Sequence, residues 1–280
     1  MYQDRSEPVT PSMPAPMFDA VPRQGKNWMY GIPPRIVATD TTTGDALALP
    51  DYLVKHYWWA YLWRPAVWFF DHQPIINTIV FGQYRKLTEA TVRLLHPQQA
   101  GSTLMIASAY GNVITKAAKA LGDNPLTVID IAPIQLERAQ VKLEKLGLDG
   151  NVTLTRMNAE SLAWPGDSFD TAFMFLLLHE LPVPSRRKAL IEALRVVRPG
   201  GSLVLAEYGG FTKTHLFHRV PLLRWIFGTA EPFLPSLWHT DLDALLTECA
   251  AVTGKRMVCE DKVWLFGGFY RVWRYRVEQA

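Results

Sequence analysis

The chain has 280 residues, 49% of them hydrophobic and 20% charged, and its formal net charge is +3. This length suits one α/β domain with a sizeable extension, and the apolar content excludes a wholly disordered chain. The mild charge, without a run of five Lys or Arg residues, gives no basis for a nucleic-acid partner. Cys249 and Cys259 form no disulfide framework, and residues 1–35 contain no apolar signal segment, so we expect a cytoplasmic protein.

The first part of the chain predicts an arm followed by a helical cap. Residues 1–48 are rich in proline and lack periodicity, which indicates an extended or disordered arm. Residues 49–98 contain the aromatic stretch YWWAYLWRPAVWFF, and their uncharged stretches are too short to span a bilayer. Pro65 and Pro74 should divide this segment into short helices, and residues 81–97 have the apolar spacing of a further helix. We expect a cap that lies at an interface or covers a substrate.

Residues 99–280 predict one catalytic α/β domain. Strand patterns alternate with helical patterns, which implies a parallel, doubly wound sheet with right-handed crossovers. The expected strands are 102–108, 126–131, 151–156, 169–176, 201–207, 255–264 and 267–277, and the expected helices are 112–121, 133–146, 184–197 and 240–251. An aromatic, proline-rich insertion, residues 209–239, follows the fifth strand.

Ligands of such a sheet bind across the carboxyl ends of its strands, so the segments that follow the first four strands should form a pocket. Asp130 ends the second strand, where a carboxylate can accept hydrogen bonds from both hydroxyls of a ribose; a helix N-cap is the alternative. Asn158, Ala159 and Glu160 should meet an adenine edge, and Glu160 as a plain surface acid is the alternative.

Five segments between residues 81 and 280 resemble, in order and spacing, the class I adenosylmethionine-dependent methyltransferases, nearest to the ubiquinone and menaquinone group. The segments are GSTLMIASAYGNVIT, VIDIAPIQL, NAESLAWPGDSFD, FMFLLLHELP and RVVRPGGSLVLAEY. The resemblance implies a Rossmann-like class I methyltransferase fold, to which this chain adds the N-terminal helical cap and the aromatic insertion. It also implies that adenosylmethionine is bound by Ala107, Ser108, Ala109, Gly111, Asp130, Ile131, Asn158, Ala159, Glu160 and Phe175.

The glycine-rich loop of that family is altered in this chain. The acid of the family pattern falls on Met105, its first two glycines fall on Ala107 and Ala109, and only Gly111 remains. Gly111 can still take the positive φ that the turn needs. Loss of the acid leaves the α-amino group of the cofactor less firmly held as a cation. We therefore expect a retained cofactor pocket with altered chemistry.

The loop ASAYGN and the aromatic segment YWWAYLWRPAVWFFDHQ together resemble one offshoot of that group, the rhodoquinone biosynthesis proteins, from about residue 51 onward. This resemblance implies an enzyme that transfers an amino group from adenosylmethionine to ubiquinone, with a manganese(II) requirement. One alternative is a conventional quinone or lipid methyltransferase. Another is a non-catalytic lipid-binding partner in quinone synthesis, against which Asp130 and Asn158 argue because a dead pocket does not need them.

Three residues are candidates for catalysis on the acceptor side. His179, in the HELP turn after the fourth strand, is the first candidate for a base or metal ligand, although a positional role is the alternative. For Glu180 three roles are open: it supports His179, it binds the metal, or it is a surface acid. Tyr110 hydrogen-bonds the quinone carbonyl or the cofactor carboxylate, or it simply packs the loop.

The metal ligands stay unassigned, because no HxH, HxxxH or ExxH pair lies near the predicted pocket. His215 and His218 are three residues apart in the insertion, and Asp71 and His72 lie in the aromatic segment. For all four side chains a solvated or interfacial role is favoured over metal binding.

The aromatic residues indicate a membrane surface as a partner. Ten Trp, ten Tyr and thirteen Phe residues crowd into segments 57–70, 208–238 and 264–275. In the insertion, Arg219 and Arg224 interleave with apolar residues, so the segment can place its apolar face in lipid and its cations at anionic headgroups; a lid packed on the core is the alternative. Since ubiquinone resides in the bilayer, we expect peripheral association with the inner membrane. The sequence does not indicate an oligomeric state.

Overall fold

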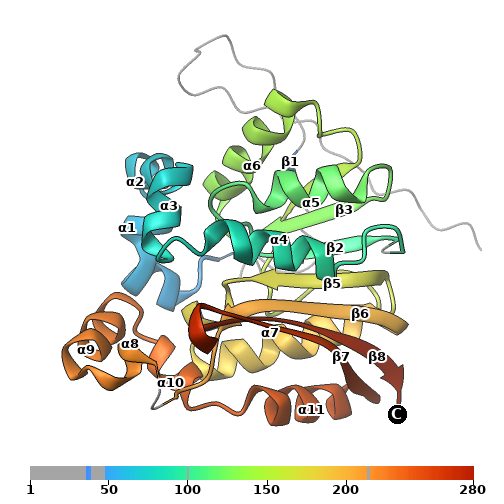
Figure 1. The fold of residues 1–280 in the computed structure, drawn as a ribbon. Helices are drawn as coiled ribbons and strands as arrows, with labels where there is room; N and C mark the ends of the chain where they lie inside the picture. The colour runs from blue at the N-terminus through green and yellow to red at the C-terminus, as the bar shows by residue number, and fades with distance from the viewer. Residues whose placement is uncertain (1–35, 39–47, 100, 213–214) are drawn as a thin grey trace, which may run out of the picture. The chain divides into compact units, whose positions relative to one another are not determined.

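The computed structural model describes residues 36–38, 48–99, 101–212 and 215–280. Within these residues eight strands form one sheet in the order β1-β4-β3-β2-β5-β6-β8-β7 (Figure 1). The strands are β1 Ile36–Ala38, β2 Thr103–Ile106, β3 Leu126–Asp130, β4 Val152–Arg156, β5 Phe169–Phe175, β6 Val197–Tyr208, β7 Lys255–Leu265 and β8 Tyr270–Gln279. Strands β1 to β6 pair in parallel, whereas β8 is antiparallel to both β6 and β7.

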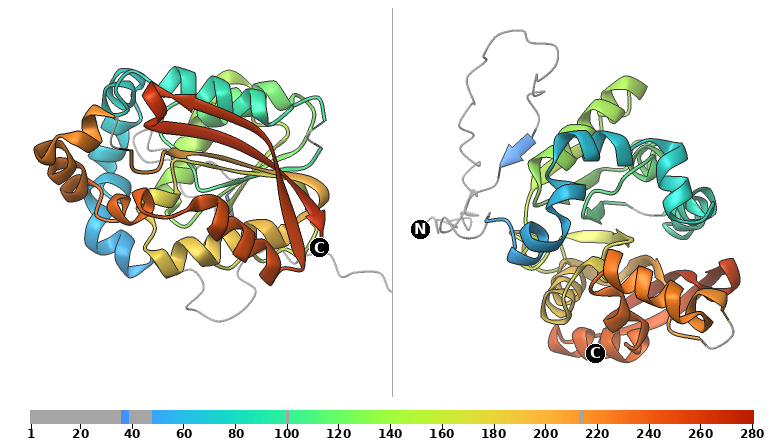
Figure 2. Two further views of the ribbon diagram at one scale, coloured as in Figure 1. Left: turned by 60° about the horizontal axis from the view of Figure 1, so that its bottom comes forward. Right: turned by 90° about the vertical axis from the view of Figure 1, so that its left-hand side faces the viewer.

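The predicted doubly wound, mostly parallel sheet is confirmed. Helices α4 Tyr84–Leu94, α5 Val113–Leu121 and α6 Pro133–Leu146 cover one face of the sheet, and α7 Val183–Val196 and α11 Leu242–Val252 cover the other (Figure 2, left). Because both faces are covered, the four residues of the central strand β2 are all buried, and three of them are apolar.

One strand boundary differs clearly from the sequence prediction. Strand β6 begins at Val197 rather than at residue 201, directly after α7 ends. The reason is that Val197 pairs with Phe169, and a register shift then precedes the regular pairing of Thr171 with Ser202. The Arg-Pro-Gly-Gly segment, which resembles a turn in sequence, therefore forms part of an irregular strand.

The cap consists of short helices, as its prolines predict. A π-helical turn, Leu53–Tyr57, is followed by α1 Trp58–Tyr61, α2 Arg64–Phe70 and α3 Gln73–Ile79. Pro65 and Pro74 each lie in the first turn of a helix, where the missing amide hydrogen costs no intrahelical bond. Of the predicted arm the structure describes residues 36–38, which form edge strand β1, and residue 48; the rest lies outside the described residues.

The insertion forms α8 Leu216–Arg219, α9 Pro221–Ala230 and α10 Leu234–Trp238. These helices lie beside the cap at one end of the sheet (Figures 1 and 2). The contact is aromatic, because Phe81 packs on Phe217 with ring centroids 4.6 Å apart and Tyr52 meets Phe233 at 6.3 Å. Among the described residues, no helix has the length and apolarity needed to cross a bilayer.

Candidate active site

A pocket opens where the carboxyl ends of β2, β3 and β5 meet the cap and the insertion. It contains about 1150 Å³ of space, including its open mouth. Residues from the sheet, the cap and the insertion all line it, and tyrosines are prominent among them. The lining tyrosines are Tyr52, Tyr57, Tyr61, Tyr84, Tyr110 and Tyr208. The pocket is thus built from segments that are distant in sequence.

The first position of the loop after β2 carries backbone strain. Ala107 has a φ of +67°, a conformation that costs a residue with a Cβ about 1–2 kcal/mol. Nearby, the Asp130 carboxylate accepts hydrogen bonds from the backbone amides of Ser108, at 2.9 Å, and Ala132, at 2.8 Å. Burial raises the pKa of Asp130 to about 7, although these amides partly offset the effect. Asp130 therefore fixes the loop from the end of β3.

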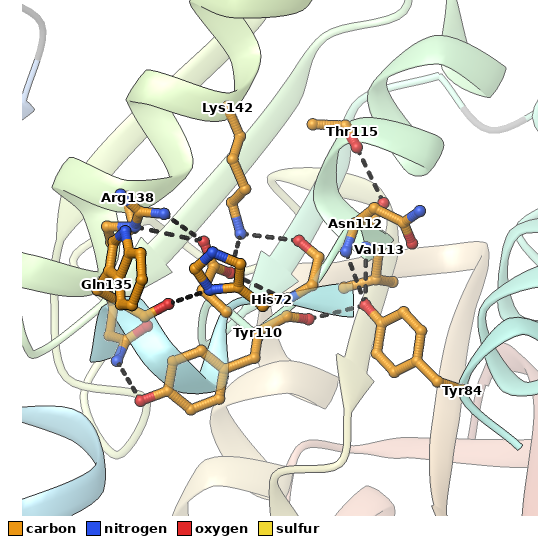
Figure 3. A network of polar contacts seen from close by, with 12 residues as sticks. His72, Tyr84, Tyr110, Asn112, Val113, Thr115, Gln135, Arg138 and Lys142 are labelled. Carbon is orange, nitrogen blue, oxygen red and sulfur yellow. Dashed lines mark hydrogen bonds and ion pairs between the residues drawn. The ribbon is translucent and has the colours of Figure 1, made fainter. Parts of the chain in front are cut away.

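The Tyr84 hydroxyl fixes the end of the same loop (Figure 3). It donates to the carbonyl oxygen of Tyr110 at 2.7 Å and accepts from the amides of Asn112, at 2.9 Å, and Val113, at 3.1 Å. Amides at the start of a helix have no intrahelical partner, so this hydroxyl satisfies donors at the first turn of α5. Tyr84 thereby joins α4 to the loop.

A buried carboxylate, Asp71, joins the cap to the loop and to α6. Asp71 lies between α2 and α3, and its oxygens accept from the Gly111 amide at 3.0 Å, from Lys142 Nζ at 2.8 Å and from Arg138 Nη2 at 3.0 Å. Lys142 also donates to the Gly111 carbonyl oxygen at 2.8 Å. The two cations converge on this point (Figure 3). This burial and pairing differ from the solvated or interfacial role that the sequence suggested.

Tyr110 contributes its ring to the pocket, whereas its hydroxyl is engaged elsewhere. The hydroxyl donates to the carbonyl oxygen of Ala60 in the cap and accepts from Gln135 Nε2 at 3.2 Å. Its ring stacks on Tyr61, with centroids 5.3 Å apart and planes 11° from parallel. These contacts agree with the loop-packing alternative for Tyr110, which is also among the residues that line the pocket.

His179 and Glu207 form a buried pair at the far side of the pocket. His179 lies in the turn after β5, and its Nδ1 is 2.8 Å from Oε1 of Glu207 at the end of β6. Burial alone would lower the pKa of His179, but the Glu207 carboxylate outweighs it and raises the pKa to about 9. Burial would conversely raise the pKa of Glu207, and the imidazolium holds it below its usual range. At neutral pH the pair is therefore an imidazolium and a carboxylate.

Two further carboxyl groups face the pocket, and each accepts a hydrogen bond from a cap tyrosine. Tyr61 donates to Glu180, and Tyr57 donates to Oε2 of Glu231 at 2.9 Å. Burial raises the pKa of Glu180 to about 8, despite the opposing effect of His179, whose Nε2 lies 3.9 Å from Oε1. Among the described residues, no group of three or more His, Cys, Asp or Glu side chains is arranged to hold a metal ion.

Comparisons with known proteins agree with this architecture. The family described as "Methyltransferase domain" matches residues 104–201. The ubiquinone/menaquinone biosynthesis C-methyltransferase UbiE of Pseudoalteromonas translucida is 30% identical over 136 residues, which cover 48% of this chain and 53% of that protein. The chain thus spans about half the length of the curated relatives it matches. Over residues 104–201 the chain is thus similar to a methyltransferase domain.

Solved structures show the same fold. The mitomycin 7-O-methyltransferase MmcR aligns with a TM-score of 0.55 at 15% identity, over 81% of this chain and 61% of that chain. The [4+2]-cyclase SpnF aligns with a TM-score of 0.50 at 19% identity, over 69% of this chain and 82% of that chain. The predicted Rossmann-like class I methyltransferase fold is confirmed by these neighbours together with the sheet order.

Most of the predicted site residues line this pocket. They are Ala107, Ser108, Ala109, Tyr110, Asp130, Ile131, Asn158, Ala159, Phe175, His179 and Glu180. Gly111 and Glu160 do not line it. The Gly111 amide and carbonyl instead bind Asp71 and Lys142, and the Glu160 carboxylate lies 3.5 Å from Lys188 Nζ.

Sequence reasoning missed the pocket residues Tyr57, Tyr61 and Glu231, and it missed Glu207, which pairs with His179 behind the pocket wall. Tyr57 and Tyr61 belong to the aromatic segment that was expected to cover a substrate, but nothing in it singled them out. Glu207 was detectable, because it ends a parallel strand next to β5, as Asp130 ends β3. Glu231 follows α9 in the insertion without any motif, and only the folded structure places it in the pocket.

Substitution of Gly111 by alanine should destabilise the protein for two reasons. Gly111 has a φ of +78°, and an added Cβ would lie 2.5 Å from the Tyr84 hydroxyl and 2.8 Å from Gln73 Nε2. Gly147 is a matched control, since its φ is +64° and a Cβ there would meet nothing within 4 Å. We expect Gly147→Ala to lower the free energy of unfolding by about 1–2 kcal/mol, and Gly111→Ala by about 1–3 kcal/mol more, in urea denaturation. Equal losses would show that the loop has room to adjust.

Removal of the Asp71 charge should loosen the cap. Asp71→Asn leaves Arg138 and Lys142 without their carboxylate, and we expect the free energy of unfolding to fall by about 2–4 kcal/mol. Asp51→Asn is the control, because the ion pair of Asp51 with Lys55 is exposed and should change the free energy by at most about 0.5 kcal/mol. Chemical denaturation measures both. If both variants lost a similarly small free energy of unfolding, Asp71 would not be what holds the cap to the loop and α6.

Proposed function

We propose that this protein transfers the amino group of adenosylmethionine to ubiquinone, replacing a ring methoxy group and yielding rhodoquinone, as its resemblance to the rhodoquinone biosynthesis protein RquA implies. One observation carries the proposal. The donor half of the pocket, at the ends of β2 and β3, is continuous with a tyrosine-lined half that contains His179 and Glu180. A flat electrophile and a proton-accepting group would meet there beside the donor.

The donor half suits an adenosyl group. Asp130 lies at the end of β3, where its carboxylate can accept from ribose hydroxyls, and Met157, Asn158 and Ala159 follow β4 beside it. Gly111 would act indirectly, by shaping the loop, and Glu160 would lie at the rim. The strained Ala107 would bring the backbone close to the donor, which is a use often found for strain at binding sites.

The acceptor half supplies groups for amine addition. The α-amine attacks the ring carbon that bears methoxy, a carbon–nitrogen bond forms, and the carbon–oxygen bond breaks so that methoxide leaves and takes a proton as methanol. The His179 imidazolium would donate a hydrogen bond to the quinone carbonyl oxygen, and the Glu180 carboxylate would accept the ammonium proton. Release of rhodoquinone then breaks the bond between this nitrogen and the donor's α-carbon by elimination: a proton leaves the donor's β-carbon, its electron pair forms an α,β double bond in the departing fragment, and the nitrogen keeps the C–N pair and takes a proton.

Conventional methyl transfer to a quinone is the second candidate, and the similarity to UbiE favours it. The fold itself does not decide between the two reactions, because one fold carries many chemistries. The structural neighbour SpnF, whose title names it a [4+2]-cyclase, is an example of this range. The altered loop, with Met105 buried in β2 at the position of the family's acid, favours amine transfer.

The manganese(II) that the resemblance implies has no ready set of ligands among the described residues. His179 Nδ1 is engaged by Glu207, and Glu180 is engaged by Tyr61. No step above is therefore assigned to a metal. The requirement stays part of the proposal and is tested by running the assay with and without manganese(II).

Peripheral contact with the inner membrane completes the proposal. Trp58, Trp63 and Trp68 of the cap are each more than half exposed, as are Leu222 and Trp225 of the insertion. Cap and insertion lie side by side at the pocket, so lipid contact there would let the quinone enter without crossing water. No nucleic-acid partner is proposed.

The proposed reaction is tested with purified protein, ubiquinone and manganese(II). Adenosylmethionine is labelled with nitrogen-15 at the amine in one assay and with carbon-13 at the S-methyl group in another, and the quinone product is analysed by mass spectrometry. We expect nitrogen-15 in the product and no carbon-13. Asp130→Asn, which weakens the ribose site, should reduce the labelled product at least about tenfold. Carbon-13 in the quinone would instead establish methyl transfer.

The pH dependence of amination follows from the two acceptor-side groups. The rate should rise as Glu180 ionises near pH 8 and fall as the His179 imidazolium loses its proton near pH 9. Glu207→Gln removes the largest of the charges that raise the pKa of His179, and burial then opposes only the smaller contributions of Glu231 and Glu180, so this pKa falls. The alkaline limb of the kcat profile should therefore move to lower pH. An unmoved limb would exclude His179 as the proton donor.

A further inference from the structure

The insertion delivers one carboxylate, Glu231, to the pocket. Glu231 follows the last residue of α9, and the Tyr57 hydroxyl of the cap donates to its Oε2 at 2.9 Å. The neighbouring Phe233 packs against the cap, with its ring centroid 5.4 Å from that of His56 and 6.4 Å from that of Tyr57. The position of Glu231 is thus fixed from both sides of the contact between cap and insertion.

Apart from its tyrosines, the titratable groups that line the pocket are mostly carboxyl groups, which a bound cation would favour in the ionised form. Asp130, Glu180 and Glu231 line it, and no Lys or Arg is among the lining residues that the structure describes. The single lining histidine, His179, is paired with Glu207 behind the wall. Such a pocket is complementary to a ligand that carries positive charge.

Glu231 differs from the other two lining acids in its partners. Asp130 accepts two backbone amides, and Glu180 lies 3.9 Å from the imidazole of His179. Within the described part of the chain, Glu231 forms no ion pair, and Tyr57 is its hydrogen-bond partner. A carboxylate removed from water is costly unless a cation or further donors meet it. The remaining partner is therefore to be sought in the ligand.

We propose that Glu231 binds the α-ammonium group of adenosylmethionine and thereby turns the amine, rather than the S-methyl group, toward the acceptor. This inference rests on the proposed function, because it assumes that adenosylmethionine is the donor. The loop after β2 offers no carboxylate for this role. Met105 carries no charge, and the carbonyl oxygens of Tyr110 and Gly111 already accept from Tyr84 and Lys142.

The same geometry keeps the amine reactive. A permanent ion pair would hold the nitrogen as ammonium, which is not a nucleophile. Burial raises the pKa of Glu231, although the nearby His179 charge and the Tyr57 hydrogen bond partly oppose this. Its carboxylate therefore shares the ammonium proton more readily than a surface carboxylate, and Glu180 in the same pocket provides a second acceptor.

The proposal is tested by calorimetric titration with two ligands, adenosylmethionine and the analogue in which hydrogen replaces the α-amino group. The wild-type protein should bind adenosylmethionine about tenfold to a hundredfold more tightly than the analogue. In Glu231→Gln the new side chain can still accept the Tyr57 hydrogen bond but carries no charge. The preference for adenosylmethionine over the analogue should therefore fall below about threefold, while the affinity for the analogue is unchanged. Glu248→Gln, which alters an exposed ion pair with Arg187, is the matched control and should keep the wild-type ratio.

The outcomes separate this inference from the proposed function. An undiminished ratio in Glu231→Gln overturns the role of Glu231 and leaves amino transfer standing. Equal binding of both ligands to the wild type does the same. Absence of adenosylmethionine binding to the wild type contradicts both proposals. If Glu231→Gln does not fold, Glu231→Asp takes its place, because it retains the charge on a shorter side chain. The ratio of the two affinities, adenosylmethionine over the analogue, should then lie between one and the wild-type value. A ratio equal to the wild-type value would overturn the proposal.

Discussion

The carboxylate of Asp71 joins three parts of the molecule that are distant in sequence. It receives the Gly111 amide from the loop after β2 and two cations from α6, and it belongs to the cap. Because Asp71 is almost fully buried, removing its carboxylate would leave the two cations and the Gly111 amide without their shared acceptor, so cap, loop and helix hold their positions together. The shape of the donor loop therefore depends on a residue outside the class I core.

The same cap forms the tyrosine-lined half of the pocket. Tyr57 and Tyr61 donate to Glu231 and Glu180, so the cap orients two carboxyl groups that come from different parts of the chain. Glu207, which is buried beside His179, favours the protonated form of this histidine. A sheet with the class I methyltransferase fold is thus combined with two additions that complete its pocket. The proposed amine transfer depends on these additions.

The sheet and its helices were predictable because both leave periodic patterns. Buried strands such as β2 are mostly apolar, Asp130 stands at a strand end, and Pro65 and Pro74 mark helix starts. The irregular start of β6 was not predictable, because its register shift depends on pairing with β5. Asp71 and Glu231 were not identified either, since their burial results from contacts between segments 40 or more residues apart. Nothing in their local sequence distinguishes them from solvated acids.

The orientation of the bound donor decides most directly whether the pocket presents an amine. It can be measured by solid-state NMR on a complex of the protein with doubly labelled adenosylmethionine and a short-tailed quinone that has methyl groups in place of methoxy and so cannot react. Distances are measured from the amine nitrogen and from the S-methyl carbon to the substituted ring carbon. We expect the nitrogen to be the nearer atom, at about 3–3.5 Å. A nearer methyl carbon would contradict amine transfer and favour a conventional methyltransferase.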